Sequence, residues 1–354
     1  MKNKILSIAL LAAITGSTEA QVKNNDVYKH TDRFQSEVRN EIRLPKVNGL
    51  LPLKCDFHMH TVFSDGQVWP TIRVQEAWQH GLDIISLTDH MEHSPNKQGN
   101  INDANRIAQE YAQDKGIIVV KGIEISKSKP LGHLNALFVK DAMKVKNDDG
   151  LKAIDEAIKQ GAFIEWNHPG WPDLKSTLYP VHQELIKKNK IHGVEVFNYD
   201  EHYPVSFDWC NEMNLAYMSN SDVHGLISID YGIDMKMRPM TIAFSKTKSE
   251  KGVREALFSR RTIAYFFGEI AGKEDLIREF VKASVDVVFS NEKHLELYNH
   301  TDISYTLKGK TSTYHLKAGK TLRVPLNKEA NSYEVVNCHI GMNKVLMIDL
   351  EEFL

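Results

Sequence analysis

The sequence contains very few cysteines: only Cys55, Cys210 and Cys338 in 354 residues. So small and scattered a set excludes a disulfide scaffold. Cys55 and Cys210 stand in apolar surroundings, and we interpret them as small core residues. In an exported protein, the odd count would leave at least one thiol free.

An excess of charge of one sign is also missing, because 44 Lys and Arg balance 46 Asp and Glu. The composition therefore indicates no general attraction to nucleic acid or to an anionic membrane. The sequence shows no internal repeat and no low-complexity segment. Its length is enough for a large core in one to three domains.

Long apolar runs are absent, so the sequence predicts no membrane-spanning helix. Residues 1–20 combine a positive start with a short apolar run, Ile5–Ile14, and small residues at their end. This pattern is typical of a signal peptide, and we expect a periplasmic or secreted protein. Residues 21–47 are polar and charged, and we expect an N-terminal leader that packs loosely over the domain.

Residues 48–283 alternate short apolar runs with amphipathic helical stretches. Ile84–Leu87, for example, is followed by a helical stretch at Asp103–Lys115 and a second apolar run at Ile117–Val120. Alternating strands and helices predict a parallel sheet with right-handed crossovers. About seven such strands in some 230 residues favour a β/α barrel over an open sheet.

Residues 284–354 have a different pattern. Short runs such as Val285–Phe289, Ile303–Leu307 and Val345–Ile348 alternate apolar and polar residues and are separated by polar turns. This pattern predicts a small antiparallel, β-sandwich-like domain.

Side chains that commonly bind metals stand at or just past the edges of the predicted strands. His58 and His60 share one face of a strand end, because successive side chains of a strand point to opposite faces. Most of the others follow the C-terminal end of a strand, where β/α barrels gather catalytic groups. His133 is the exception, at the start of its strand. We therefore predict a site for divalent metals, formed by His58, His60, Asp65, His90, Glu124, His133, His168, Asp222 and His224.

Each of these residues also has an ordinary structural explanation. His90 could be the partner of a helix cap, His168 a turn residue, His133 a core histidine and Glu124 a solvated strand end. The repeated coincidence of such residues with strand edges favours the metal interpretation over separate accidents.

The motifs around these residues resemble those of the PHP (polymerase and histidinol phosphatase) superfamily, over about residues 50–270. The resemblance implies a distorted seven-stranded β/α barrel with a trinuclear metal site. The matching motifs are His58-Met59-His60-Thr61 with Ser64-Asp65-Gly66, Thr88-Asp89-His90, Gly122-Ile123-Glu124, Gly132-His133-Leu134-Asn135, Asn167-His168-Pro169 and Ser221-Asp222-Val223-His224.

By resemblance, three divalent ions (Zn, Mn or Fe) would be bound by three sets of residues: His58, His60, Glu124 and Asp222; Asp65, His90 and His224; and Glu124, His133 and His168. The second set, acting with a metal-bound hydroxide, supplies the predicted catalytic residues. Asp65 stands where some relatives have histidine, which leaves the identity of the second metal open.

The charge of such a site favours phosphate esters. Three divalent ions, three carboxylates and one hydroxide would leave roughly two positive charges, which attract a phosphate better than a neutral amide. Metal pairs activate water and clamp phosphate oxygens, and the sequence has no G-x-S-x-G nucleophile motif. We therefore predict an exported metal-dependent phosphoesterase that hydrolyses small phosphomonoesters or phosphodiesters.

Other functions stay open. One alternative is an amidohydrolase-like metallohydrolase of C–N or C–O bonds, and another is a non-catalytic metal- or glycan-binding module. The expected export disfavours a polymerase proofreading role and the hydrolysis of histidinol phosphate. We expect a small phosphorylated substrate, no nucleic acid polymer and no membrane span.

Residues outside the predicted metal site could assist it. Asp89 could orient a neighbouring histidine or cap the next helix. His93, His202, Arg238 and Arg261 could contact the phosphate or protonate a leaving group, although surface salt bridges would explain the arginines equally well.

Overall fold

The computed structural model describes residues 38–92, 99–232, 238–326 and 331–354. The predicted signal peptide and most of the leader lie outside these ranges. Arg39–Leu354 forms one compact unit. Within the described ranges, every helix is too short or too polar to cross a bilayer.

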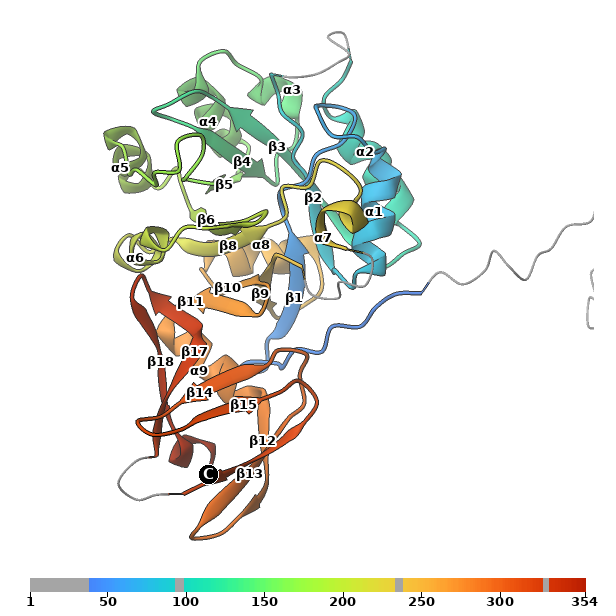
Figure 1. Cartoon of the computed structure of the whole chain (residues 1–354). Helices are drawn as coiled ribbons and strands as arrows, with labels where there is room; N and C mark the ends of the chain where they lie inside the picture. The colour runs from blue at the N-terminus through green and yellow to red at the C-terminus, as the bar shows by residue number, and fades with distance from the viewer. Residues whose placement is uncertain (1–37, 93–98, 233–237, 327–330) are drawn as a thin grey trace, which may run out of the picture. The chain divides into compact units, whose positions relative to one another are not determined.

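Strands and helices alternate through the first two thirds of the chain, as the sequence predicts (Figure 1). The strands are β1 Leu51–Asp56, β2 Ile84–Leu87, β3 Ile118–Ser126, β4 His133–Leu137, β5 Phe163–Trp166, β6 Gly193–Asn198, β7 Glu201–His202, β8 Ala216–Asn220, β9 Met240–Ser245, β10 Thr262–Phe266 and β11 Glu269–Gly272.

Local sequence explains where several of the helices begin. The side chain of Asp149 accepts hydrogen bonds from the first turn of α4, and Ser249 does the same for α8, so both are N-caps. Proline opens α1 and α5. The helices are α1 Pro70–Gln79, α2 Asp103–Ala112, α3 Ala142–Val145, α4 Gly150–Lys159, α5 Pro180–Lys187, α6 Val205–Glu212, α7 Ile227–Tyr231, α8 Glu250–Phe258 and α9 Glu274–Ala283.

The sheet is mixed, which corrects the prediction of a parallel sheet. Strand order is β9-β1-β2-β3-β4-β5-β6, with β8 paired to β6. The pairs β1–β2, β2–β3, β5–β6 and β6–β8 are parallel, but β4 runs antiparallel to both β3 and β5, and β9 to both β1 and β10. The β3–β4 connection is short, and parallel neighbours need a much longer crossover.

The reversed direction of β4 explains the position of His133. Its partner across the β3–β4 ladder is Ser126, at the C-terminal end of β3. The start of β4 therefore lies at the same edge of the sheet as the C-terminal ends of the parallel strands. His133 is thus not an exception in space, although it is one in sequence.

The edges of this curved sheet approach each other at β8 and β9. The Ser219 amide donates a 2.9 Å hydrogen bond to Thr241 Oγ1, and this hydroxyl lies 3.0 Å from the Ser219 carbonyl. The Thr241 side chain therefore joins β8 and β9 here. Among the described residues, these two strands form no backbone hydrogen-bond ladder. The seven-stranded barrel stays a prediction, while the mixed α/β class is observed.

A buried apolar cluster supports the sheet from inside. Leu53 and Cys55 of β1 pack with Ile84, Val120 and Met218 from three further strands. Burial of each large aliphatic side chain contributes about 1.5–3 kcal/mol, so the strand ends are held on a rigid base. All three cysteines are buried and free, as expected for Cys55 and Cys210.

The C-terminal part is rich in antiparallel strands, as predicted. β12, β13 and β16 form a separate three-stranded sheet, whereas β14, β15, β17 and β18 extend the large sheet through a parallel β11–β17 pair. The domain boundary expected at residue 284 falls between α9 and β12. The elements are β12 Val285–Ser290, β13 His294–Asn299, β14 Tyr305–Lys308, β15 Thr313–Leu316, β16 Thr321–Pro325, β17 Ser332–Gly341, β18 Lys344–Asp349 and the 3-10 helix η2 Leu350–Phe353.

The described end of the leader makes specific contacts. The Arg39 guanidinium donates to the carbonyls of Trp78 and Gly81, and Arg43 forms a salt bridge with Asp302. Loose packing is therefore wrong for residues 39–47.

His192 links the fold to pH. It is buried, its Nδ1 accepts a 2.9 Å hydrogen bond from the Ile164 amide, and burial together with the charges of Arg260 and Arg254 lowers its pKa to about 4. The folded protein thus binds fewer protons here than the unfolded chain, whose histidines titrate near 6.5. The free energy of unfolding should fall as the pH drops below about 6.5.

We expect His192 to account for about 2 kcal/mol of the stability lost between pH 7.5 and pH 5. Urea unfolding of the metal-free protein at both pH values measures the loss. His192→Gln, which keeps a hydrogen-bond acceptor, should lose about 2 kcal/mol less than the wild type. An equal loss in both proteins would contradict this assignment.

Candidate metal centre

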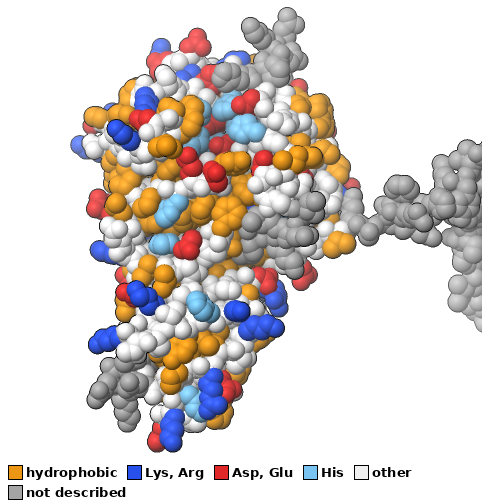
Figure 2. Space-filling model, in the orientation of Figure 1, with side chains coloured by type: hydrophobic (Ala, Val, Ile, Leu, Met, Phe, Trp, Pro, Cys, Tyr) orange, Lys and Arg blue, Asp and Glu red, His pale blue; other side chains and the backbone are white. Residues whose placement is uncertain are grey.

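The structure brings all nine predicted residues together at one edge of the sheet. They form four overlapping groups, in each of which the potential ligand atoms lie within 4.8 Å of one another. In the space-filling view, histidine and acidic side chains gather around a hollow (Figure 2). The groups are His60, Asp65, His90 and His224; His58, His168 and Asp222; His58, His60 and Glu124; and His90, Glu124 and His133.

Backbone hydrogen bonds connect the loop after β1 with the loop after β8. The His60 amide donates to the Val223 carbonyl at 3.0 Å, and the Asp222 amide donates to the His58 carbonyl at 2.9 Å. His58 and His60 are fully buried, and their Nε2 atoms lie 3.1 Å apart. These contacts aim ligands from distant parts of the sequence at the same point.

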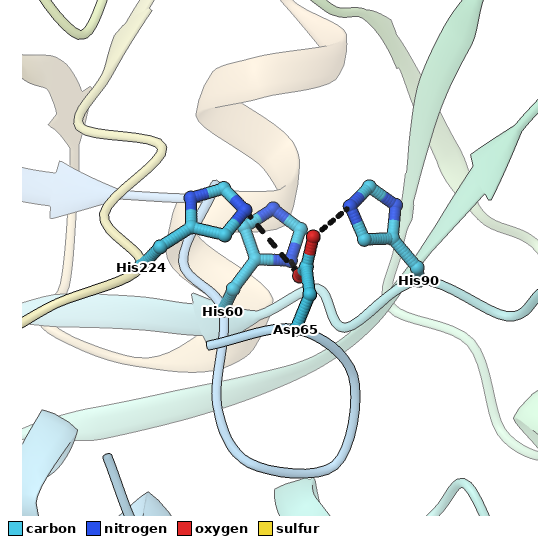
Figure 3. Close-up of side chains that lie close together, drawn as sticks. All are labelled: His60, Asp65, His90 and His224. Atoms are coloured by element: carbon cyan, nitrogen blue, oxygen red, sulfur yellow. Dashed lines mark ion pairs between the residues drawn. The ribbon is translucent and has the colours of Figure 1, made fainter. Parts of the chain in front are cut away.

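Asp65 lies between His224 and His90, with His60 close behind (Figure 3). Its two oxygens are 3.3 Å from His224 Nε2 and 3.4 Å from His90 Nε2. The loop must turn back tightly to place it, because a Cβ on Gly66 would lie 2.6 Å from the His60 carbonyl carbon. Only glycine avoids that clash. Although burial opposes the shift, His224 and His90 hold the pKa of Asp65 well below its usual range.

Glu124 is the centre of the cluster. The side chain is completely buried, and five imidazoles have a nitrogen within 4.0 Å of its carboxylate. The shortest contacts are 2.6 Å to His90 Nδ1 and 3.0 Å to His133 Nδ1. The side-chain amide of Asn167 donates a hydrogen bond to Glu124 Oε1 at 2.9 Å. Burial raises the pKa of Glu124, but His90 and His58 outweigh it, so the carboxylate is ionised.

Two of the predicted ligands have unusual backbone conformations. Asp222 has a φ of 51° and His168 a φ of 26°, in a region that residues other than glycine adopt rarely. Such strain concentrates at functional sites, where the surrounding structure holds it in place.

The residues present fit divalent metal ions. Glu124 Oε2, His133 Nδ1 and Asp222 Oδ1 are buried and, among the residues described, make no hydrogen bond of good geometry, although ionisable groups of the cluster lie within 3.1 Å of each. Buried polar atoms without a well-formed hydrogen bond are costly, and a cation would satisfy all three. Imidazole nitrogens and carboxylate oxygens are ligands for Zn²⁺, and suit Mn²⁺ and Fe²⁺ as well.

The geometric groups differ in detail from the ligand sets implied by resemblance. His60 belongs to the Asp65 group as well as to the group with His58 and Glu124, and His168 lies with His58 and Asp222 rather than with His133. The assignment of individual residues to individual ions stays a prediction.

Glu195, in the middle of β6, was missed by the sequence analysis. Its Oε1 lies 2.9 Å from His58 Nδ1, and its Oε2 accepts from the His168 amide and the Asn198 side chain. A carboxylate behind a ligand histidine fixes the tautomer and orientation of the ring. The available signal was a lone acidic residue in the apolar run Gly193–Phe197.

Arg73 of α1 was also missed. It is fully buried, and its guanidinium donates to the carbonyls of His60 (2.8 Å), Val223 (3.1 Å) and His224 (2.8 Å). It therefore binds together two loops that carry predicted ligands. Its sequence neighbourhood on an ordinary helix offers no signal for this role.

Asp89 supports the loop that carries Asp65. Its Oδ1 accepts from the Thr61 amide and from the Ser64 hydroxyl, both at 2.7 Å, and Ser64 Oγ lies 3.4 Å from His60 Nδ1. Orientation of a histidine by Asp89, one of the two expected roles, thus acts through Ser64.

Of the four residues considered for phosphate contact, the three that the structure describes do not line the cleft. Arg238 is buried beside Asp56, at 2.9 Å, and Arg261 bonds the Phe244 carbonyl and Glu255. His202 stacks on Phe207. His93 lies outside the described residues.

The cluster opens into a cleft of about 530 Å³. Its inner wall consists of predicted ligands, namely Asp65, His90, His133, His168, Asp222 and His224. This volume suits a small molecule. A pocketed cluster of histidines and carboxylates at the strand ends of an α/β fold defines the chain as a metallohydrolase-type protein.

Comparison with known proteins agrees with this class. A family model of the PHP domain matches residues 56–190. The structure resembles that of a two-domain protein of Bacteroides vulgatus ATCC 8482, containing a predicted PHP-like metal-dependent phosphoesterase, with 38% identity, a TM-score of 0.83 and coverage of 89% of this chain and 99% of that chain.

Two further relatives are more distant. An uncharacterized protein of Methanocaldococcus jannaschii is 28% identical over 196 residues, 49% of this chain and 82% of its own. An amidohydrolase from Chromobacterium violaceum is 16% identical, with a TM-score of 0.40 over 51% of this chain and 90% of that chain; at that score it carries no argument about function. The chain belongs to the PHP family.

We predict that Glu195→Gln weakens the binding of Zn²⁺ or Mn²⁺ about 10–100-fold, because it replaces the charged acceptor that orients His58 with a neutral amide. Competition with a chromophoric chelator measures the affinity. Glu165→Gln is the matched control, since Glu165 shares the Asn220 side chain with Glu195 but the contact to His58 belongs to Glu195. Equal affinities for wild type and Glu195→Gln would refute the orienting role.

Proposed function

We propose that the protein is a metal-dependent phosphoesterase that hydrolyses small phosphomonoesters or phosphodiesters. The observation that carries the proposal is the concentration of six imidazoles and three carboxylates in one cluster, of which four imidazoles and two carboxylates line the cleft. The similarity to the Bacteroides vulgatus protein over nearly its whole length supports the choice of phosphate chemistry. The family resemblance also favours the distorted seven-stranded barrel as the scaffold.

We infer three divalent ions, Zn, Mn or Fe, bound by the nine residues. Ions of this kind lower the pKa of bound water and stabilise the charge of a phosphoryl group in an in-line displacement. Glu124, whose carboxylate lies within 4.0 Å of five histidine nitrogens, would bind the ions together with these histidines. Glu195, Arg73 and Asp89 hold ligands in place from behind.

The predicted catalytic residues all line the cleft and include the two most exposed of the predicted ligands. The side chains of Asp65 and His224 are 48% and 38% exposed, and both line the cleft together with His90. Burial lowers the pKa of His90, but the charges of Glu124 and Asp65 raise it to about 10. Metal binding must displace such protons, so affinity should fall as the pH decreases.

The same cluster suits the alternatives less well. An amidohydrolase would use the same donors on a neutral amide, which gains less from an excess of positive charge. A metal- or glycan-binding module without catalysis would not need all nine potential metal ligands to be present. We further propose export of the mature protein, on the strength of the signal-like residues 1–20.

Metal removal tests the catalytic proposal. Treatment with EDTA followed by gel filtration should abolish hydrolysis of p-nitrophenyl phosphate or bis-p-nitrophenyl phosphate, and Mn²⁺ or Zn²⁺ should restore it. The fold should persist, which circular dichroism checks. Full activity in protein shown to be metal-free would rule out the proposal, and activity on amides or esters alone would favour the metallohydrolase alternative.

Export is tested separately. Expression of the complete chain with a C-terminal tag in a Gram-negative host, followed by osmotic shock, should release a protein that lacks about 20 N-terminal residues. Mass spectrometry of the released protein identifies its first residue. An uncleaved chain in the cytosolic fraction would contradict export without touching the catalytic proposal.

A further inference from the structure

The cleft has two walls of opposite chemistry. Its inner wall consists of predicted metal ligands, whereas its outer wall consists of Trp171, Tyr199, Asp200, Glu201, Ile229 and Asp230. No Lys or Arg occurs among the described residues that line the cleft. The outer wall combines carboxylates with exposed apolar and aromatic surface.

The aromatic side chains are well supported. The Trp171 ring lies 4.8 Å from that of His133 and 5.7 Å from that of His168, directly beside the predicted metal site. The Tyr199 ring meets Tyr231 edge-on at 6.0 Å. Trp171 is nevertheless 52% exposed and Tyr199 40% exposed, so both offer surface to a ligand.

The three carboxylates of the outer wall, Asp200, Glu201 and Asp230, line the same part of the cleft as Tyr199. The pKa of the Tyr199 hydroxyl is raised by burial and by the charges of Asp230, Asp200 and Asp222. The oxygens of Asp230 also lie near Gly225 of the facing wall, 3.6 Å from where a Cβ would be. Glu201 accepts a hydrogen bond from Tyr203. Among the described residues, no salt bridge neutralises Asp200, Glu201 or Asp230.

We propose that the preferred substrate is a phosphoester whose alcohol carries a positive charge, such as a quaternary ammonium group. With metals bound, the inner end of the cleft is positive and the outer end negative. A molecule with a phosphate at one end and a cation at the other matches both ends, and carboxylates beside aromatic faces are typical of ammonium recognition.

Other small phosphate esters match less well. A neutral sugar could hydrogen-bond to the carboxylates, but it would leave their mutual repulsion uncompensated. A nucleic acid chain would bring further phosphates against Asp200, Glu201 and Asp230, where like charges repel. The inference rests on the proposed phosphoesterase function and specifies its substrate class.

A pair of isosteric substrates tests the inference. Phosphocholine and 3,3-dimethylbutyl phosphate have nearly the same shape, but nitrogen makes the first a cation and carbon leaves the second neutral. If the enzyme cleaves only diesters, the p-nitrophenyl diesters of the same two alcohols replace them. We expect kcat/KM to be roughly tenfold higher for the cation.

Substitutions in the outer wall should remove this preference. In Asp230→Asn the ratio of the two kcat/KM values should fall, and in the triple variant Asp200→Asn, Glu201→Gln, Asp230→Asn it should approach one. Asp148→Asn is the matched control, because Asp148 is exposed and does not line the cleft, and it should keep the wild-type ratio. Metal content and thermal melting identify any variant that is misfolded.

The outcomes separate the two proposals. Equal or lower kcat/KM for the cationic ester, with p-nitrophenyl phosphate or its diester turned over, would overturn the inference and leave the phosphoesterase standing. A preference for a hexose phosphate over both isosteres would overturn it in favour of a neutral polyol. With no phosphate ester hydrolysed by metal-loaded protein, both proposals fall together.

Discussion

The site depends on one physical constraint, which is that the Glu124 carboxylate has no access to water. Glu124 has zero exposure, and an ionised carboxylate in that position is very unfavourable without compensating positive charge. The surrounding imidazoles supply part of that charge, and cations held between them would supply the rest. The loops after β1, β2 and β5 and the start of β4 all converge on this one residue.

Three further buried residues, Glu195, Arg73 and Asp89, hold the predicted ligands in place. Glu195 fixes a ring of the first histidine pair, Arg73 binds the loops of His60 and His224 together, and Asp89 holds the turn before Gly66. Each is buried, so rearrangement of the ligands would leave a polar group without a partner. The site is therefore rigid before any metal arrives, which lowers the free-energy cost of binding.

Sequence reasoning was most successful where chemistry repeats in short motifs. All nine candidate ligands meet, because strand ends at one edge of a sheet must be neighbours. Strand direction was harder: β4 and β9 run against the expected direction, since periodicity indicates a strand but not its orientation. The sequence did not reveal the roles of Glu195 and Arg73, because these roles depend on contacts with residues far away in the chain, which no local pattern encodes.

Different parts of the structure carry the predicted metal ligands and form the opposite wall of the cleft. Strand ends and the loops after them carry the predicted ligands, while the segments of Tyr199–Glu201 and Asp230 form the opposite wall of the cleft. Under the proposed function, the ligands would determine metal binding, and the outer wall would determine which alcohol the phosphate ester carries.

The most direct test of the central claim is a crystal of the protein grown with Mn²⁺, with diffraction data collected on both sides of the manganese absorption edge. The account predicts strong anomalous peaks about 3.5–4 Å apart, enclosed by the nine residues and bridged by Glu124. A crystal saturated with Mn²⁺ that showed no peak there, with the imidazoles paired directly to the carboxylates, would contradict it.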